Sequence, residues 1–223
     1  MALHITVYQS LFNSTEYTSE DYMFYAMLEQ MRSKDLEKLA EEYFNKAIDA
    51  YETGTHSNSI TKDVSFISRM GLIDLLSKHG RGNECIEQYK NAIKEEPNVI
   101  NHYVCLAHAY SYSGQDEKRR EALESGLKVD DKNAILLFHM GRFCEATGEY
   151  EDAFAYWEAS YDANNELPDN LFSKAYLYEK TDKNAEAIKM WEQIVNWLKE
   201  RGYEVELSFP KRELQRITDK LNS

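Results

Sequence analysis

The amino-acid sequence predicts an all-helical protein built from repeated helical hairpins. Only 3 Pro and 9 Gly occur among 223 residues, so few positions interrupt a helix. Apolar residues recur at steps of three and four on both sides of short turns. The same pattern returns every 34 residues. Because one hairpin cannot bury its own apolar stripe, a stack of hairpins is the expected architecture.

Four consecutive segments carry this pattern in unbroken register; they begin at Phe66, Ile100, Ala134 and Pro168. One column holds mostly small residues, where two helices must approach closely: Ile73, Ala107, Gly141 and Ala175. A second column holds residues that tolerate a tight turn: Gly80, Gly114, Gly148 and Asp182. A third, bulky column follows on the second helix: Tyr89, Leu123, Trp157 and Trp191. Each segment is therefore expected to be a helix, a turn and a second helix.

A fifth copy of the pattern lies upstream at shifted spacing, over residues 21–54. Residues 55–65 lengthen the interval before the next copy and are expected to form an exposed loop or joint. Residues 1–20 form an N-terminal extension without a clear helical period.

The four repeats in register occupy residues 66–201. Residues 202–223 hold a linker and a last amphipathic helix that opens at Pro210, with Leu214, Ile217 and Leu221 on one side. Because a terminal repeat needs a polar outer cover, this helix is expected to cap the stack.

The columns resemble the tetratricopeptide repeat (TPR) family, whose 34-residue unit reads W-x2-L-G-x2-Y, then A-x3-F, then P. The third segment matches best, with Leu137-x2-Met140-Gly141-x2-Cys144, Gly148 and Ala153-x3-Trp157. One departure is Lys174, which replaces an apolar residue. The resemblance covers about residues 21–201 and implies a right-handed superhelical solenoid of about five helix-turn-helix repeats with a C-terminal capping helix. It also implies a concave groove, lined by the first helices, for peptides or partner helices.

Two further columns on the first helices are candidates for contacting a partner. The first is apolar or aromatic: Tyr25, Met70, Val104, Phe138 and Phe172. The second, four residues later, has mixed chemistry and extends toward the turn: Glu29, Asp74, His108, Arg142 and Tyr176, with Tyr112. If the resemblance holds, they give the groove an aromatic floor flanked by groups that fix a peptide's register. Packing between helices is the alternative explanation of the floor.

A TPR subfamily that binds the acidic C-termini of heat-shock proteins carries a carboxylate clamp of Lys, Asn and Arg on its first helices. The residues that stand at about the clamp positions in this sequence are Tyr25, Glu29, Met70, Asp74, Asn101 and Cys105. Only Arg142 could serve a carboxylate, so no such clamp is predicted.

The composition narrows the class of partner. The chain has 26 Lys and Arg against 39 Asp and Glu, a net charge of −13, which is the wrong sign for binding nucleic acid. No stretch approaches the length of a membrane span, and no short catalytic or cofactor motif occurs. The spacing of His102, Cys105 and His108 makes a metal site conceivable, but no second cluster accompanies it. We therefore expect neither an enzyme, a metal site nor a cofactor, and no membrane or nucleic-acid partner.

The expected function is that of a cytoplasmic scaffold or adaptor that binds a protein or peptide partner. The cytoplasmic expectation comes from three cysteines that are odd in number and lack C-x-x-C spacing: Cys85, Cys105 and Cys144. Two alternatives remain open. One is self-assembly into a homo-oligomer through end residues such as Trp197 and Tyr203; the other is a regulatory receptor for a signalling peptide.

Overall fold

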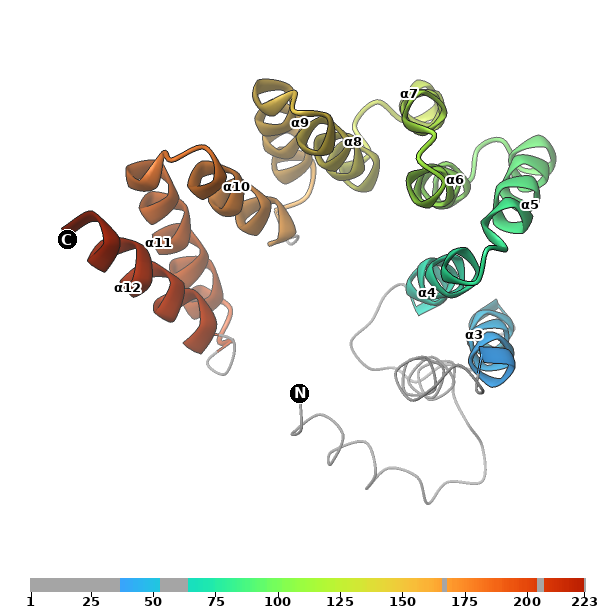
Figure 1. Cartoon of the computed structure of the whole chain (residues 1–223), viewed down its shortest axis with the longest axis horizontal. Helices are drawn as coiled ribbons and strands as arrows, with labels where there is room; N and C mark the ends of the chain where they lie inside the picture. The colour runs from blue at the N-terminus through green and yellow to red at the C-terminus, as the bar shows by residue number, and fades with distance from the viewer. Residues whose placement is uncertain (1–36, 53–63, 166–167, 204–206, 223) are drawn as a thin grey trace, which may run out of the picture. The chain divides into compact units, whose positions relative to one another are not determined.

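The computed structural model describes residues 37–52, 64–165, 168–203 and 207–222. All regular structure in these residues is α-helical (Figure 1), which confirms the predicted fold class. The described ranges contain ten helices: α3 (Glu37–Glu52), α4 (Val64–Lys78), α5 (Gly82–Glu95), α6 (Ile100–Tyr112), α7 (Asp116–Val129), α8 (Ala134–Thr147), α9 (Tyr150–Ala163), α10 (Asp169–Lys180), α11 (Asn184–Glu200) and α12 (Ser208–Asn222). None of these helices is both long enough and apolar enough to cross a membrane.

The chain divides into two compact units, which are described separately. The first contains residues 1–95 and 108–115, and the second contains residues 96–107 and 116–223. Helix α6 contributes residues to both.

In the first unit, α3 packs against α4, and α4 packs against α5. The contact between α3 and α4 is close because Gly71 has no side chain: a Cβ there would lie 2.6 Å from the ring of Phe44. Phe44 is fully buried, and Ile73 and Cys85 are 1 % exposed. Arg81 joins α3 to the start of α5, since its guanidinium contacts Glu41 at 2.6 Å and Glu84 at 2.8 Å.

In the second unit, α8 pairs with α9 and α10 pairs with α11, while α9 also contacts α10 and α11 contacts α12 (Figure 1). The indoles of Trp157 and Trp191 fill the centres of these two pairs and are fully buried. Gly141 lets α8 approach Trp157, because a Cβ at this glycine would lie 2.5 Å from the indole ring. The Nε1 of Trp157 donates a hydrogen bond of 3.2 Å to the backbone oxygen of Phe138. Gly141, a member of the small column, thus lies at a close helix approach, as the sequence predicts.

The turns between paired helices adopt the left-handed backbone conformation that the turn column predicts. Gly80, Gly114 and Gly148 have φ values of 77°, 64° and 85°, and Asp182 has a φ of 56°. Glycine reaches this region without a steric penalty, and Asp tolerates it better than most residues. At the end of α8, the backbone N–H of Gly148 is directed to the carbonyl oxygens of Cys144 and Glu145, which satisfies the helix terminus.

Several boundaries differ from the predicted ones by a few residues, as helix ends commonly do. Helix α4 begins at Val64, inside the predicted loop over residues 55–65. The last helix begins at Ser208, two residues before Pro210. Of the apolar residues predicted on one side of this helix, Ile217 is fully buried, whereas Leu221 is 51 % exposed. The first helix of the upstream copy lies outside the described residues.

Gly141→Ala should lower the free energy of unfolding by about 1–3 kcal/mol, because the new methyl group would overlap the buried indole of Trp157. Alanine is the better helix former by roughly 1 kcal/mol, so a net loss would show that the steric conflict dominates. Urea unfolding, monitored by circular dichroism, measures the change in the free energy of unfolding. The control Ala159→Ser adds one heavy atom at an exposed site on α9 and should change stability by no more than about 0.5 kcal/mol. A Gly141→Ala variant as stable as the wild type would contradict the close approach.

Candidate functional site

In the first unit, three of the predicted partner-binding residues form one polar cluster. The Nε2 of His108 lies 2.6 Å from a carboxylate oxygen of Asp74, although the two residues are 34 positions apart. The hydroxyl of Tyr112 also hydrogen-bonds to Asp74. The rings of His108 and Tyr112 meet edge to face, with centroids 5.2 Å apart. The period of the sequence thus brings together residues from α4 and α6.

The cluster holds Asp74 in its ionised form. Burial disfavours the carboxylate and by itself would raise the pKa, but the hydrogen bonds from His108 and Tyr112 outweigh it, with the charges of His108 and Lys78 acting in the same direction. The pKa of Asp74 therefore lies below its ordinary value of 3.8. Met70, one turn earlier on α4, is half-buried. Tyr112 is 46 % exposed, so part of the cluster faces solvent.

In the second unit, the predicted residues of α8 and α10 divide into a half-buried layer and an exposed layer. Phe138 and Phe172 are half-buried, whereas Arg142 and Tyr176 are exposed. The rings of Phe172 and Tyr176 both meet the indole of Trp191 edge-on, at centroid distances of 5.8 and 5.3 Å. Burial raises the pKa of Tyr176, and the nearby carboxylates of Glu213 and Glu179 add to the shift. This surface offers aromatic area and hydrogen-bonding groups on rigid helices.

No protein-family model matches the chain. A stretch of 111 residues, 50 % of this chain, is 27 % identical to Small glutamine-rich tetratricopeptide repeat-containing protein 2 of Mycosarcoma maydis and spans 30 % of that protein. Among solved structures, TTC0263, a TPR protein of Thermus thermophilus, covers 89 % of this chain and 99 % of its own length, at 17 % identity and a TM-score of 0.59. A TPR protein of Parabacteroides merdae covers 91 % of this chain and 74 % of its own length, at 15 % identity and a TM-score of 0.53. The chain has the tetratricopeptide repeat fold.

Within this TPR fold, some predicted site residues take other roles. Val104 has no exposed surface, so its expected contact with a partner is wrong: it belongs to the core. Tyr25 and Glu29 lie outside the described residues. Trp197, expected at an exposed end, is only 8 % exposed because its indole stacks with Tyr203 and donates a hydrogen bond of 2.9 Å to the backbone oxygen of Asn165.

The histidines of the conceivable metal site contact carboxylates, and the cysteines are buried. The ring of His102 contacts Glu96 at 3.1 Å, while His108 contacts Asp74. In the described part of the chain, no group of three or more His, Cys, Asp or Glu side chains is arranged to hold a metal ion. All three cysteines are buried thiols. Burial raises the pKa of the Cys85 and Cys144 thiols to about 11, which keeps both protonated at neutral pH.

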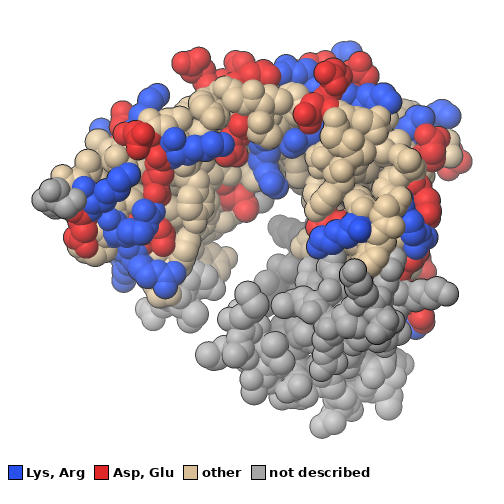
Figure 2. Space-filling view, in the orientation of Figure 1, with Lys and Arg blue, Asp and Glu red and all other residues tan. Residues whose placement is uncertain are grey.

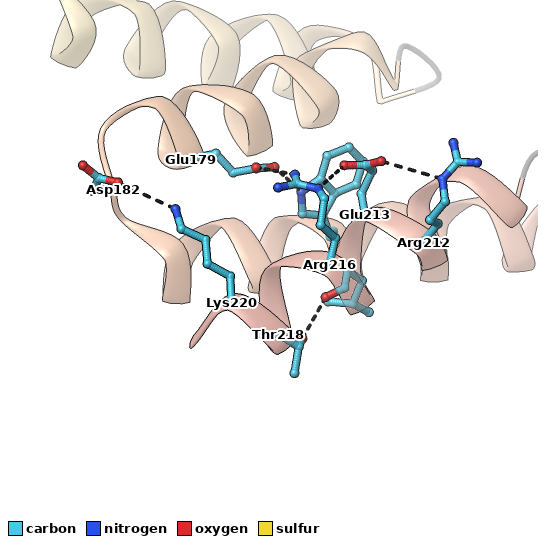
Figure 3. A network of polar contacts seen from close by, with 9 residues as sticks. Glu179, Asp182, Arg212, Glu213, Arg216, Thr218 and Lys220 are labelled. Atoms are coloured by element: carbon cyan, nitrogen blue, oxygen red, sulfur yellow. Dashed lines mark hydrogen bonds and ion pairs between the residues drawn. The ribbon is translucent and has the colours of Figure 1, made fainter. Parts of the chain in front are cut away.

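The sequence did not reveal that α12, the last helix, contributes to the surface beside α10. Figure 3 shows Arg216 of α12 directed between Glu179 of α10 and Glu213, with contacts of 2.5 and 2.8 Å. Glu179 also accepts a hydrogen bond of 3.0 Å from the Nε1 of Trp191. The 37-residue separation of Glu179 and Arg216 breaks the 34-residue period, so no column of the repeat reveals the pair.

At the departure from the pattern, the buried Lys174 forms an ion pair beside a cavity of about 300 Å³ between α9, α10 and α11. The side chain of Lys174 is 9 % exposed and pairs with Glu158, whose side chain is 60 % exposed. The cavity is also lined by Gln193, Asn196 and Trp197. Lysine thus reaches a carboxylate from a position where the TPR pattern places an apolar residue.

Asp74→Asn should lower the free energy of unfolding at pH 7 by roughly 1 kcal/mol, because the hydrogen bonds from His108 and Tyr112 would lose a charged acceptor. A carboxyl whose folded pKa is depressed stabilises the fold above its unfolded pKa, and this contribution disappears as the pH falls through the folded pKa. The difference between variant and wild type should therefore shrink below pH 3.8, as measured by urea unfolding at several pH values. Asp131→Asn, at an exposed site, is the control. A difference that persists unchanged at low pH would contradict this role.

Lys174→Met should leave the stability unchanged or raise it by about 0.5–2 kcal/mol. Methionine fills a similar length at a 9 % exposed position without the cost of desolvating an ammonium group, and Glu158 retains access to water. Thermal unfolding at pH 7 measures the change. A loss larger than about 1 kcal/mol would show that the ion pair contributes net stability.

Proposed function

We propose that this chain is a protein-interaction scaffold that binds a segment of a partner protein on the exposed faces of its first helices. The observation that carries the proposal is the layered surface of α8 and α10. Half-buried Phe138 and Phe172 lie at positions 34 residues apart, and exposed Arg142 and Tyr176 follow each of them by one turn. The TPR fold of the matched structures supports an interaction role in general.

The chemistry of this surface suits a peptide better than a small molecule. Aromatic and Arg side chains dominate the energy of protein interfaces, because they bury a large area at a small cost in side-chain entropy. Tyr176 is 46 % exposed and rests against the fully buried Trp191, so it is already oriented before a partner arrives. A surface that needs little ordering retains more of its contact energy as affinity.

The first unit offers a second, more polar surface for the same function. Tyr112 is exposed and is positioned by Asp74 and His108, so its ring is held at a fixed place beside a carboxylate. Fixed polar groups of this kind select the register and direction of a bound segment. We assign this cluster to recognition of a polar group on the partner.

The combined variant Arg142→Glu with Tyr176→Ala should lose the partner while the fold survives, because both side chains are exposed. Affinity capture from native cell extract, followed by mass spectrometry and by binding assays with the purified partner, measures the loss. We expect affinity to fall by at least about tenfold. The matched control combines Lys128→Glu with Tyr203→Ala, an exposed cation and an exposed aromatic residue away from the proposed surface. Equal capture by both variants would refute the assignment of this surface.

A further inference from the structure

The end of the second unit carries an aromatic and basic surface that the repeat columns do not include. It is built by α10 and α12, which meet through the ion pair of Glu179 with Arg216. We propose that Tyr176, Phe209 and Arg212 form a docking site for an acidic segment of a partner protein that also carries an apolar or aromatic side chain. The inference deepens the proposed function and shares Tyr176 with it, but Phe209 and Arg212 belong to it alone.

The aromatic part of the site is exposed and held in place from beneath. Tyr176 is 46 % exposed and Phe209 is 36 % exposed. Both rings meet the fully buried indole of Trp191 edge-on, at centroid distances of 5.3 and 5.9 Å. Helices α10 and α12 thus each place an exposed aromatic ring against the same indole. The Nε1 of Trp191 donates to Glu179 at 3.0 Å, which fixes the indole itself.

The two arginines of α12 have different roles. Arg216 lies between Glu179 and Glu213 and joins α12 to α10 (Figure 3). Arg212 has a side chain that is 72 % exposed, and its ion pair with Glu213 is long, at 3.9 Å. Its guanidinium carbon lies 5.5 Å from the centre of the Phe209 ring. Arg212 is therefore a solvent-facing cation beside an exposed ring, an arrangement that suits a carboxylate next to an apolar side chain.

The charge of α12 decides the class of partner. This helix holds four basic residues, Lys211, Arg212, Arg216 and Lys220, against two acidic ones, Glu213 and Asp219. The whole chain, by contrast, has a net charge of −13. Figure 2 shows blue side chains gathered over α12, whereas red side chains predominate over α9. Because opposite charges attract and like charges repel across an interface, this surface favours an acidic segment and disfavours a basic one.

The test uses the full chain and a fluorescein-labelled ten-residue peptide of alternating Glu and Gly with one central Phe. Fluorescence anisotropy measures its dissociation constant. Arg212→Glu should weaken binding by about fivefold or more, and Phe209→Ala should weaken it by about tenfold. Binding should also weaken as the salt concentration rises, since the charges involved are exposed. Circular dichroism checks the fold of each variant, and Phe209→Leu provides an apolar replacement in case Phe209→Ala unfolds α12.

Matched controls make the result specific. Lys189→Glu reverses an exposed charge on α11, and Tyr203→Ala removes an exposed aromatic ring that rests on a different indole, that of Trp197. Both should bind the peptide as the wild type does. A peptide with Lys in place of Glu, and one with Gly in place of Phe, should bind at least about tenfold more weakly than the acidic Phe peptide.

Three outcomes would overturn the inference. The first is unchanged binding by folded Arg212→Glu and Phe209 variants. The second is equal binding of the Lys-containing peptide. The third is self-association, seen by light scattering, that Arg212→Glu abolishes, which would make a second copy of this chain the occupant. Arg142→Glu tests the proposed function by capture of the native partner, whereas Arg212→Glu tests this site by binding of the acidic peptide, so failure of either proposal can be recognised separately.

Discussion

The close contact between a small residue on one helix and a bulky residue on the next is the constraint on which the structure depends. At Gly141 the backbone of α8 lies so near the indole of Trp157 that a Cβ would come within 2.5 Å of it. The side chain of Trp157 is fully buried, so it cannot yield. Gly71 and Phe44 form the same kind of contact between α3 and α4. These contacts fix the separation of neighbouring helices, and the short turns follow from it.

This mode of packing separates the residues that hold the fold from those that face outward. The stripe containing Met140, Gly141 and Cys144 is buried on α8, while Arg142 on the same helix is exposed. The exposed face of each first helix can therefore carry different residues in different repeats without disturbing the packing of the core. In the first unit that face carries Asp74 with His108, and in the second it carries aromatic rings and an arginine. A shared fold thus carries two different surfaces.

The last helix closes the core and adds to the surface at the same time. On α12, Ile217 is fully buried against the α11 side of the unit, whereas Phe209 covers part of Trp191 and remains 36 % exposed. Arg216 joins α12 to α10 through Glu179. An amphipathic helix performs both tasks because its apolar stripe and its polar face point in different directions. The four basic and two acidic residues of α12 give this helix a charge opposite in sign to that of the chain as a whole.

The sequence by itself determined the helical hairpins, the positions of their turns and the small residues at which helices approach closely. It could do so because these features repeat with the 34-residue period and depend on residues close in sequence, as with Gly141 on α8 and Gly148 in the turn that follows it. Only the tertiary structure decided which side chains reach solvent. Val104 and Trp197 are buried, and Glu179 pairs with Arg216 outside the period. The exposure of a side chain depends on every helix packed around it. The periodicity of the sequence shows only which face of its own helix a residue occupies, so it cannot predict exposure.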